Sequence, residues 1–125
     1  MKKIISTNNA PAAIGPYSQA IEVNGTLYAS GQIPIDPATG DFVAGGIKEQ
    51  TEQVFKNIKA ILAEAGLTTN NIVKTTVLLS DIANFAAMNE VYATQFEGTF
   101  PARSAFAVRD LPKAAMVEIE IIAVR

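Results

Sequence analysis

The chain has 125 residues, a net charge of −2 and a hydrophobic content of 49%. This length fits one domain over residues 1–125, which is large enough to bury a core without disulfides or a structural metal. The acidic balance and the absence of a run of lysines and arginines argue against nucleic-acid binding through a basic patch. The chain contains no cysteine and no histidine, which excludes disulfides, Ser–His–Asp and Cys–His catalysis, and metal sites with these ligands.

The first residues, Met1 to Asn9, include two lysines but no long apolar segment behind them. No apolar run in the chain reaches the roughly 18 residues of a membrane span. We therefore expect a cytoplasmic protein with no membrane contact. The mean hydropathy of +0.21 is high for a small protein and favours a homo-oligomer that covers apolar surface, with an unusually rich core as the alternative.

The first predicted element is a β-hairpin. Asn24-Gly25 separates a strand at 20–23 from a strand at 26–30 that Gly31 ends, and Asn-Gly favours a type I′ turn. From residue 47 to 65 the apolar period becomes helical, and Gly66 fits the position just past the end of a helix. One apolar stripe runs along this helix: Val54, Phe55, Ile58, Ile61, Leu62 and Ala65.

The second half of the chain predicts a strand at 72–79, a helix at about 84–97, a short strand at 104–108 and a last strand at 117–124. One face of the last strand is wholly apolar and suits burial under helices. Its other face begins with two glutamates but ends with Ile122 and Val124, which favours a second buried surface such as a subunit interface. The order of elements predicts an α+β fold, a sheet with two helices on one face.

Arg103 is the leading candidate for function. It is the only charged residue between Glu97 and Arg109, and a guanidinium in an apolar setting needs an anion. Its planar fork suits a carboxylate ligand. The alternative is an internal ion pair with Glu118 or Glu120, which share one face of the last strand and are themselves either solvated carboxylates or a working pair.

Other candidates carry weaker signals. Tyr17 stands in a rigid Gly-Pro-Tyr-Ser turn, where it either serves a site or only packs. Gly31, after Ser30, permits close approach of a ligand to the backbone, although an ordinary strand end explains it equally well. Asn89 is a polar residue in an otherwise amphipathic helix.

Four stretches, taken together, resemble a known family. They are Ala10 to Gln19 (APAAIGPYSQ), Ser30 to Pro34 (SGQIP), Phe100 to Ser104 (FPARS), and Leu111 to Glu120, with its LPK and VEIE motifs. In this order and spacing, along nearly the whole chain, they are similar to the RidA (YjgF/YER057c/UK114) family.

The resemblance implies a chorismate-mutase-like fold with a mixed sheet. It also implies a homotrimer with a central β-barrel and active sites in the clefts between subunits. The implied activity is hydrolysis of reactive 2-imino acids, 2-iminobutanoate and 2-iminopropanoate, to 2-keto acids and ammonia, without metal or organic cofactor. The alternatives are a non-catalytic module that senses a small carboxylate, a ribonuclease or translation inhibitor, which the acidic composition and absent histidine disfavour, and a holdase chaperone.

The resemblance also implies residue roles. Arg103 would bind the substrate carboxylate, and Glu118 would hold the attacking water or move its proton. The other implied site residues, drawn from two subunits, are Tyr17 in the catalytic set and Ser30, Gly31, Asn89 and Ala105 in the substrate pocket. Glu120 matches a second carboxylate of the motif and receives no role. Ala105 is a departure, because many members carry cysteine there; a thiol role is therefore absent, and the pocket is expected to be roomier.

Overall fold

The Asn24-Gly25 turn joins two antiparallel strands, β2 (Ala20–Val23) and β3 (Thr26–Gln32). Asn24 has a φ of 50° and Gly25 a φ of 79°, and a type I′ turn requires positive φ at both central residues. The predicted hairpin is therefore confirmed. β3 does not end at Gly31 but includes it and continues for one more residue.

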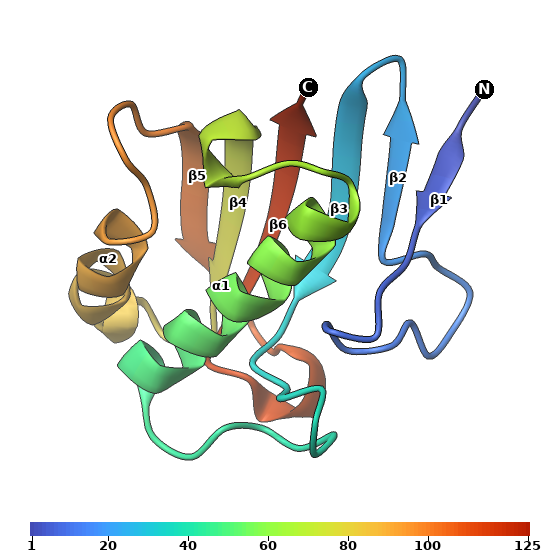
Figure 1. Ribbon diagram of the computed structural model, residues 1–125. Helices are drawn as coiled ribbons and strands as arrows, with labels where there is room; N and C mark the ends of the chain where they lie inside the picture. Colours follow the sequence, from blue (N-terminus) through green and yellow to red (C-terminus); the bar gives the residue numbers. More distant parts are fainter.

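Residues 1–125, the whole chain, are described by a computed structural model with one six-stranded sheet in the order β1-β2-β3-β6-β4-β5 (Figure 1). The remaining strands are β1 (Lys3–Ile5), β4 (Ile72–Leu79), β5 (Ala102–Ala107) and β6 (Val117–Val124). β4 and β5 pair in parallel, and the other neighbours are antiparallel. The sheet is therefore mixed, and the last strand of the sequence lies inside it, between β3 and β4.

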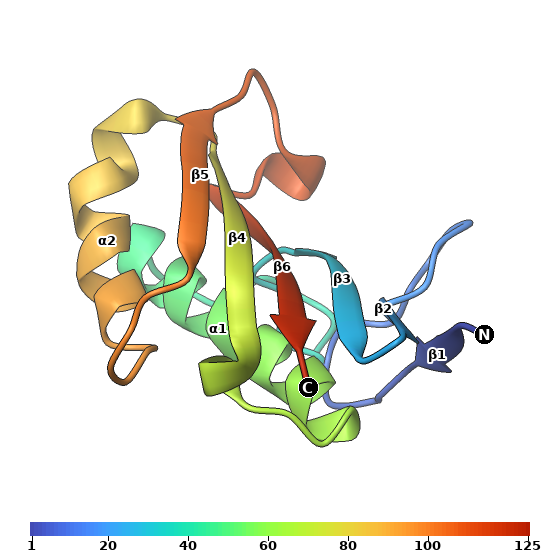
Figure 2. The same ribbon diagram turned by 90° about the horizontal axis from the view of Figure 1, so that it is seen from above.

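Two α-helices, α1 (Ile47–Glu64) and α2 (Phe85–Ala93), lie on the same side of the sheet, as Figure 1 and the turned view of Figure 2 show. Three short 3-10 turns complete the structure: η1 (Thr69–Asn71), η2 (Ile82–Asn84) and η3 (Pro112–Ala114). The predicted α+β fold, with two helices on one face of the sheet, is confirmed. No helix combines the length and the apolar content needed to cross a membrane.

The core lies between the helices and the sheet and contains a cluster of 21 buried residues. The apolar stripe of α1 and the apolar face of β6 both belong to it, as predicted. The β6 side chains are at most 2% exposed: Val117, Ile119, Ile121 and Ala123. Burying an aliphatic or aromatic side chain contributes about 1.5–3 kcal/mol. The helix-free face of the sheet, called here the open face, carries the other side chains of β6, which are half-buried or exposed.

Besides the end of β3, three further elements differ from the predictions. β1 was not predicted, because three residues are too few to show an alternating pattern. α2 ends at Ala93 rather than near residue 97, and the Thr94 hydroxyl donates to the Val91 carbonyl at 2.6 Å, a local bond that competes with helix continuation. β5 spans 102–107 rather than 104–108 because it follows the register of β4, which no local pattern reveals. Arg103 consequently lies inside a strand.

Arg125 ties the end of β6 to two other elements. Its Nε and Nη2 donate to the Glu22 carboxylate on β2 at 3.0 and 2.9 Å, and Nη2 also donates to the Ala65 carbonyl at the end of α1. This fork lowers the pKa of Glu22, chiefly through the hydrogen bonds from Arg125. The contact closes the layer of helices onto the sheet at one end of the molecule.

Candidate active site

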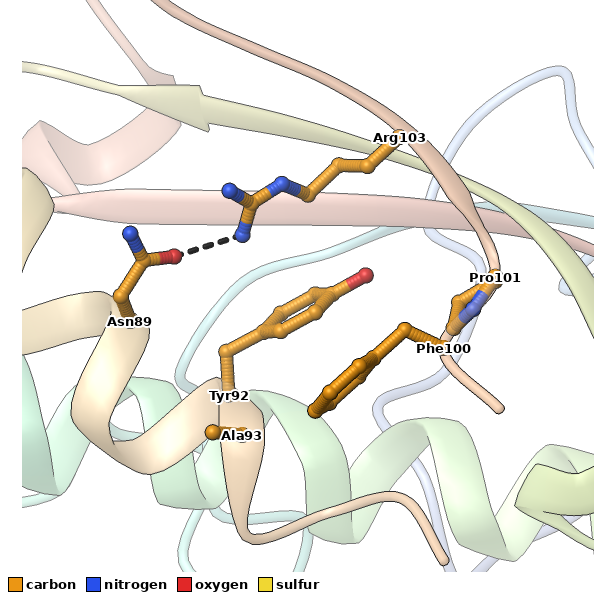
Figure 3. A pocket seen from close by; sticks show the side chains of 6 residues that line it. All are labelled: Asn89, Tyr92, Ala93, Phe100, Pro101 and Arg103. Atoms are coloured by element: carbon orange, nitrogen blue, oxygen red, sulfur yellow. Dashed lines mark hydrogen bonds between the residues drawn. The ribbon is translucent and has the colours of Figure 1, made fainter. Parts of the chain in front are cut away.

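Arg103 projects from β5 toward α2. It pairs with Thr75 of β4, which is fully buried beneath the helices, so both side chains lie on the helix-covered face. The Arg103 Nη1 donates a 2.6 Å hydrogen bond to Oδ1 of Asn89 on α2 (Figure 3). Asn89 thus orients the guanidinium without neutralising its charge.

Two aromatic rings of α2 also contact Arg103. The guanidinium carbon lies 4.7 Å from the ring centroid of Tyr92 and 5.3 Å from that of Phe85, within the range of cation–π attraction. Phe85, Asn89 and Tyr92 are spaced i, i+4 and i+7 and therefore share one face of the helix. The sequence alone did not indicate this contact, although the spacing of the two aromatic residues to Asn89 is visible in it.

Tyr92 is itself held firmly. Its hydroxyl shares a 2.8 Å hydrogen bond with the Thr75 hydroxyl, and its ring packs 5.6 Å from Phe55 and 5.0 Å from Phe96, between centroids. Burial, the largest effect, raises the pKa of Tyr92, so the phenol stays neutral at pH 7. Arg103 therefore rests on a rigid, uncharged surface.

No carboxylate of the chain pairs with Arg103. The ion pairs of the structure are Lys48–Glu90, Arg109–Asp110 and Arg125–Glu22. The alternative of an internal ion pair with Glu118 or Glu120 is therefore wrong. A guanidinium carries about five N–H donors, and Asn89 accepts a hydrogen bond from only one nitrogen of Arg103. Other donors of Arg103 therefore remain for a ligand.

A hollow of about 370 Å³ opens beside this arginine. Figure 3 shows its lining: Asn89, Tyr92, Ala93, Phe100, Pro101 and Arg103. A fixed cation with free donors and apolar neighbours is suited to gripping a small carboxylate.

The structure brings Tyr17, Ser30, Gly31 and Glu118 together around a second hollow of about 440 Å³. Tyr17 is half-exposed at 52%. The Ser30 hydroxyl donates to the Ser18 carbonyl at 2.6 Å, which ties the end of β3 to the turn that carries Tyr17.

Glu118 lies against the backbone of Gly31. A Cβ at position 31 would overlap the Glu118 carboxyl group, so a larger residue there would require the Glu118 side chain to move. Glu118 makes no ion pair. Burial raises the pKa of Glu118, and the nearby negative charge of Glu120 raises it further. The second hollow thus contains an unpaired carboxyl group that ionises less readily than usual.

The two hollows belong to opposite faces of the sheet. Arg103 pairs with Thr75 on the helix-covered face, whereas Glu118 pairs with Leu78, whose side chain alternates to the open face. Within one chain the sheet therefore separates the arginine from the glutamate, and the structure does not bring them together.

Two further residues lie outside these hollows. Ala105 is partly buried, packs against the core and lines neither hollow. Glu120 is exposed on the open face, beside a smaller hollow of about 150 Å³ that also contains Lys74. No cluster of three or more His, Cys, Asp or Glu residues suited to a metal ion is present.

The fold and the two hollows define a class of small α+β proteins, with a fixed cation on one face of the sheet and an unpaired carboxyl group on the other. Residues 7–125 match the family model described as Endoribonuclease L-PSP. The resemblance found in the sequence is confirmed, and the chain belongs to the RidA (YjgF/YER057c/UK114) family.

Individual relatives are similar in sequence to this chain over all or nearly all of its length. A 2-iminobutanoate/2-iminopropanoate deaminase of Mus musculus is 53% identical, covering 100% of this chain and 93% of the relative. RutC family protein PH0854 of Pyrococcus horikoshii is 56% identical over 98% of both chains. Among solved structures, the Rid family protein YyfA of Yersinia pestis has a TM-score of 0.97 at 58% identity, covering 100% of both chains. E. coli TdcF with bound serine has a TM-score of 0.94 at 44% identity, covering 98% of both.

Proposed function

We propose that the protein is a 2-iminobutanoate/2-iminopropanoate deaminase, which hydrolyses reactive 2-imino acids to 2-keto acids and ammonia. The observation that carries this proposal is the Arg103 guanidinium, fixed by Asn89 and two rings but without a carboxylate from its own chain. Relatives with this name in Mus musculus, Rattus norvegicus and Homo sapiens are 53%, 53% and 50% identical to the chain.

Arg103 binds the substrate carboxylate and thereby holds the neighbouring C=N carbon in place. In the protonated imine, water adds to that carbon, one of its protons passes to Glu118, and the C=N π electrons move to the nitrogen, which becomes a neutral amine. Glu118 then returns its proton to this amine, the C–N bond of the tetrahedral intermediate breaks, and the remaining O–H gives its proton to the departing ammonia as the keto C=O forms. Imine hydrolysis is already fast in water, so holding the reactants together is the main requirement. None of these steps calls for a metal or an organic cofactor.

The surroundings of Glu118 support its role as the proton carrier. Burial and the charge of Glu120 raise the pKa of Glu118. This brings the pKa closer to the pH at which the carboxyl group must both accept and donate a proton. Tyr17, Ser30 and Gly31 line the same hollow and complete the proposed substrate pocket with Asn89. Ala105 lies two residues from Arg103 on the same strand but lines neither hollow of the single chain, so its place in the pocket stays a prediction.

The separation of Arg103 from Glu118 supports an oligomeric site. We propose a homotrimer in which the arginine of one subunit faces the glutamate of the next, and the open faces form a central β-barrel. Large side chains on the open face support this assembly, because Tyr28, Phe106 and Val124 are 50%, 48% and 40% exposed. Sedimentation should give a mass of about 40 kDa, three times the 13.3 kDa of one chain. Cytoplasmic location stays a prediction.

The activity is tested by generating 2-iminopropanoate in situ and following the appearance of pyruvate and ammonia above the uncatalysed rate. We expect acceleration by the wild type and a loss of roughly 100-fold or more in kcat/KM in Arg103→Ala, because a charge-assisted grip is removed. Arg109→Ala is the matched control, since Arg109 is 97% exposed and only joins a surface ion pair. Unchanged acceleration in Arg103→Ala would contradict the mechanism.

The same experiment separates the alternatives. Saturable binding of a 2-keto acid without imine turnover would favour a sensing module. A ribonuclease, which the name of the family model suggests, is not proposed, because the chain has a net charge of −2 and no histidine. The absence of nucleic-acid binding stays a prediction.

A further inference from the structure

Helix α1 buries three amide side chains beside its apolar stripe. Gln50, Gln53 and Asn57 are 7%, 8% and 0% exposed, and their i, i+3 and i+7 spacing places them in one row along the helix. We call these three residues the amide row. No fully buried polar side-chain atom of the protein lacks a hydrogen-bond partner, and each of the three amides makes at least one hydrogen bond.

One end of the row holds the segment that follows β3. Asn57 Nδ2 donates to the carbonyls of Ile33 and Ile35 at 3.1 and 2.9 Å, and Gln53 Nε2 donates to Asn57 Oδ1 at 2.9 Å. Gln53 therefore fixes the amide of Asn57, which in turn fixes the backbone. Ile33 and Ile35 both line the hollow that contains Glu118.

The other end of the row holds the segment that leads into β6. Gln50 Oε1 accepts a 2.9 Å hydrogen bond from the backbone N–H of Met116. Met116 comes just before the first residue of β6, two positions from Glu118. The row thus grips the backbone on both sides of the hollow.

The backbone segments that Asn57 and Gln50 hold lead to the two residues of one contact, Gly31 and Glu118. Gly31 lies two residues before the backbone held by Asn57, Glu118 lies two residues after the backbone held by Gln50, and the Glu118 carboxyl lies against Gly31. We propose that the amide row positions the Glu118 carboxyl against Gly31 for the deaminase reaction. This inference rests on the proposed function. None of the three amides lines the hollow, so they act as positioning residues.

Neutral amides suit this task because each supplies both donors and an acceptor without burying a charge. An apolar side chain at position 57 would remove one of the two donors from each carbonyl. Ile33 would keep only the 2.8 Å bond from the Ile35 N–H, and Ile35 only a 3.4 Å bond from Gln53 Nε2. The segment would therefore shift toward other donors. A displacement of about 1 Å close to a reacting group lowers a rate by as much as roughly 100-fold.

The test is a double-mutant cycle on kcat. Asn57→Leu and Gln50→Met remove the grips, and each is measured in the wild type and in Glu118→Gln. In the wild type, we expect each substitution to lower kcat about 10-fold and to change KM less than about twofold. In Glu118→Gln, each should lower kcat less than about twofold, because the residue being positioned is already altered. Gln50→Glu keeps the acceptor for Met116 and should restore most of the kcat that Gln50→Met loses.

Thr51→Val is the matched control. Thr51 is fully buried on the same helix, and its hydroxyl donates only to the Ile47 carbonyl of that helix at 2.7 Å. We expect a loss of stability without a change in kcat. The inference would be overturned if Asn57→Leu and Gln50→Met lowered kcat equally in the wild type and in Glu118→Gln. It would also be overturned if their loss of activity were explained by a smaller folded fraction, as any loss in Thr51→Val would be.

A second measurement does not depend on turnover. Titration of the Glu118 carboxyl by ¹³C NMR should show a lower pKa in Asn57→Leu and Gln50→Met than in the wild type, because a displaced carboxyl gains water. An unchanged titration in both variants overturns the positioning inference even if the wild type is active. A wild type without imine turnover, but with shifted titrations in the variants, overturns the proposed function alone.

Discussion

At the scale of single residues, the fold treats the two proposed working charges differently. The Arg103 guanidinium lies over aromatic rings and donates to a neutral amide acceptor. Glu118 meets burial and a like charge, both of which disfavour its ionised form. Of the two groups, the carboxyl group is therefore the one that is ready to change its protonation state.

The pH dependence of the reaction follows from this difference. Only ionised Glu118 accepts a proton, and its raised pKa means that kcat/KM falls on acidification earlier than an ordinary glutamate would cause. Glu120→Gln removes a charge that raises this pKa, so the acid limb of the profile should move to lower pH. Glu52→Gln, an exposed change on α1, is the control. An acid limb that moves upward, or moves equally in both variants, would contradict the assignment of Glu118.

Gly31 gives a steric prediction. Gly31→Ala places a methyl group where the Glu118 carboxyl lies, so the carboxyl must turn away, and we expect kcat/KM to fall at least about 10-fold. Gly46→Ala is the control, because the nearest atom to a Cβ there is 4.0 Å away. Full activity in Gly31→Ala would show that the Glu118–Gly31 contact is not needed.

At the scale of elements, the turn η3 is strained. Lys113 and Ala114 have φ values of 55° and 59°, a left-handed conformation that costs a residue with a Cβ about 1–2 kcal/mol. This turn holds Pro112 and Lys113 at the Glu118 hollow. Its backbone is therefore maintained by the surrounding structure rather than by its own preference.

Ala114→Gly should relieve part of this strain. Ala114 is exposed, so the change removes no packing, and we expect stabilisation of about 0.5–1 kcal/mol after the extra freedom of glycine in the unfolded chain is deducted. Ala115→Gly is the control, because Ala115 is buried with a φ of −59°, and it should destabilise. Chemical denaturation at one fixed protein concentration measures both, and a destabilised Ala114→Gly would refute the strain.

The sequence predicted those elements whose structure depends on neighbouring residues in the chain. The hairpin follows from Asn24-Gly25, and α1 follows from its apolar period. The parallel pairing of β4 with β5 was not predictable, because it depends on contacts between distant segments. The sequence also identified Arg103 and Glu118 as candidates, but their separation by the sheet depends on the register of three strands.

At the scale of the whole molecule, a site shared between copies has a test in mixed oligomers. Arg103→Ala and Glu118→Gln each lose activity alone, but in a mixture an intact arginine can face an intact glutamate of another copy. After subunit exchange at equal amounts, about one quarter of the sites should be intact. Recovery of imine hydrolysis toward that fraction is the expected result. A mixture as inactive as its components would place the whole site in one chain.

The packing of Ala105 against the core has a chemical consequence. Neither hollow is lined by a sulfur atom, and Met88 on α2 is fully buried. Peroxides and thiol-alkylating reagents act on accessible thiolates and thioethers, and neither hollow offers such a group. Because the chain contains no cysteine, we expect thiol-alkylating reagents to leave the rate of imine hydrolysis unchanged.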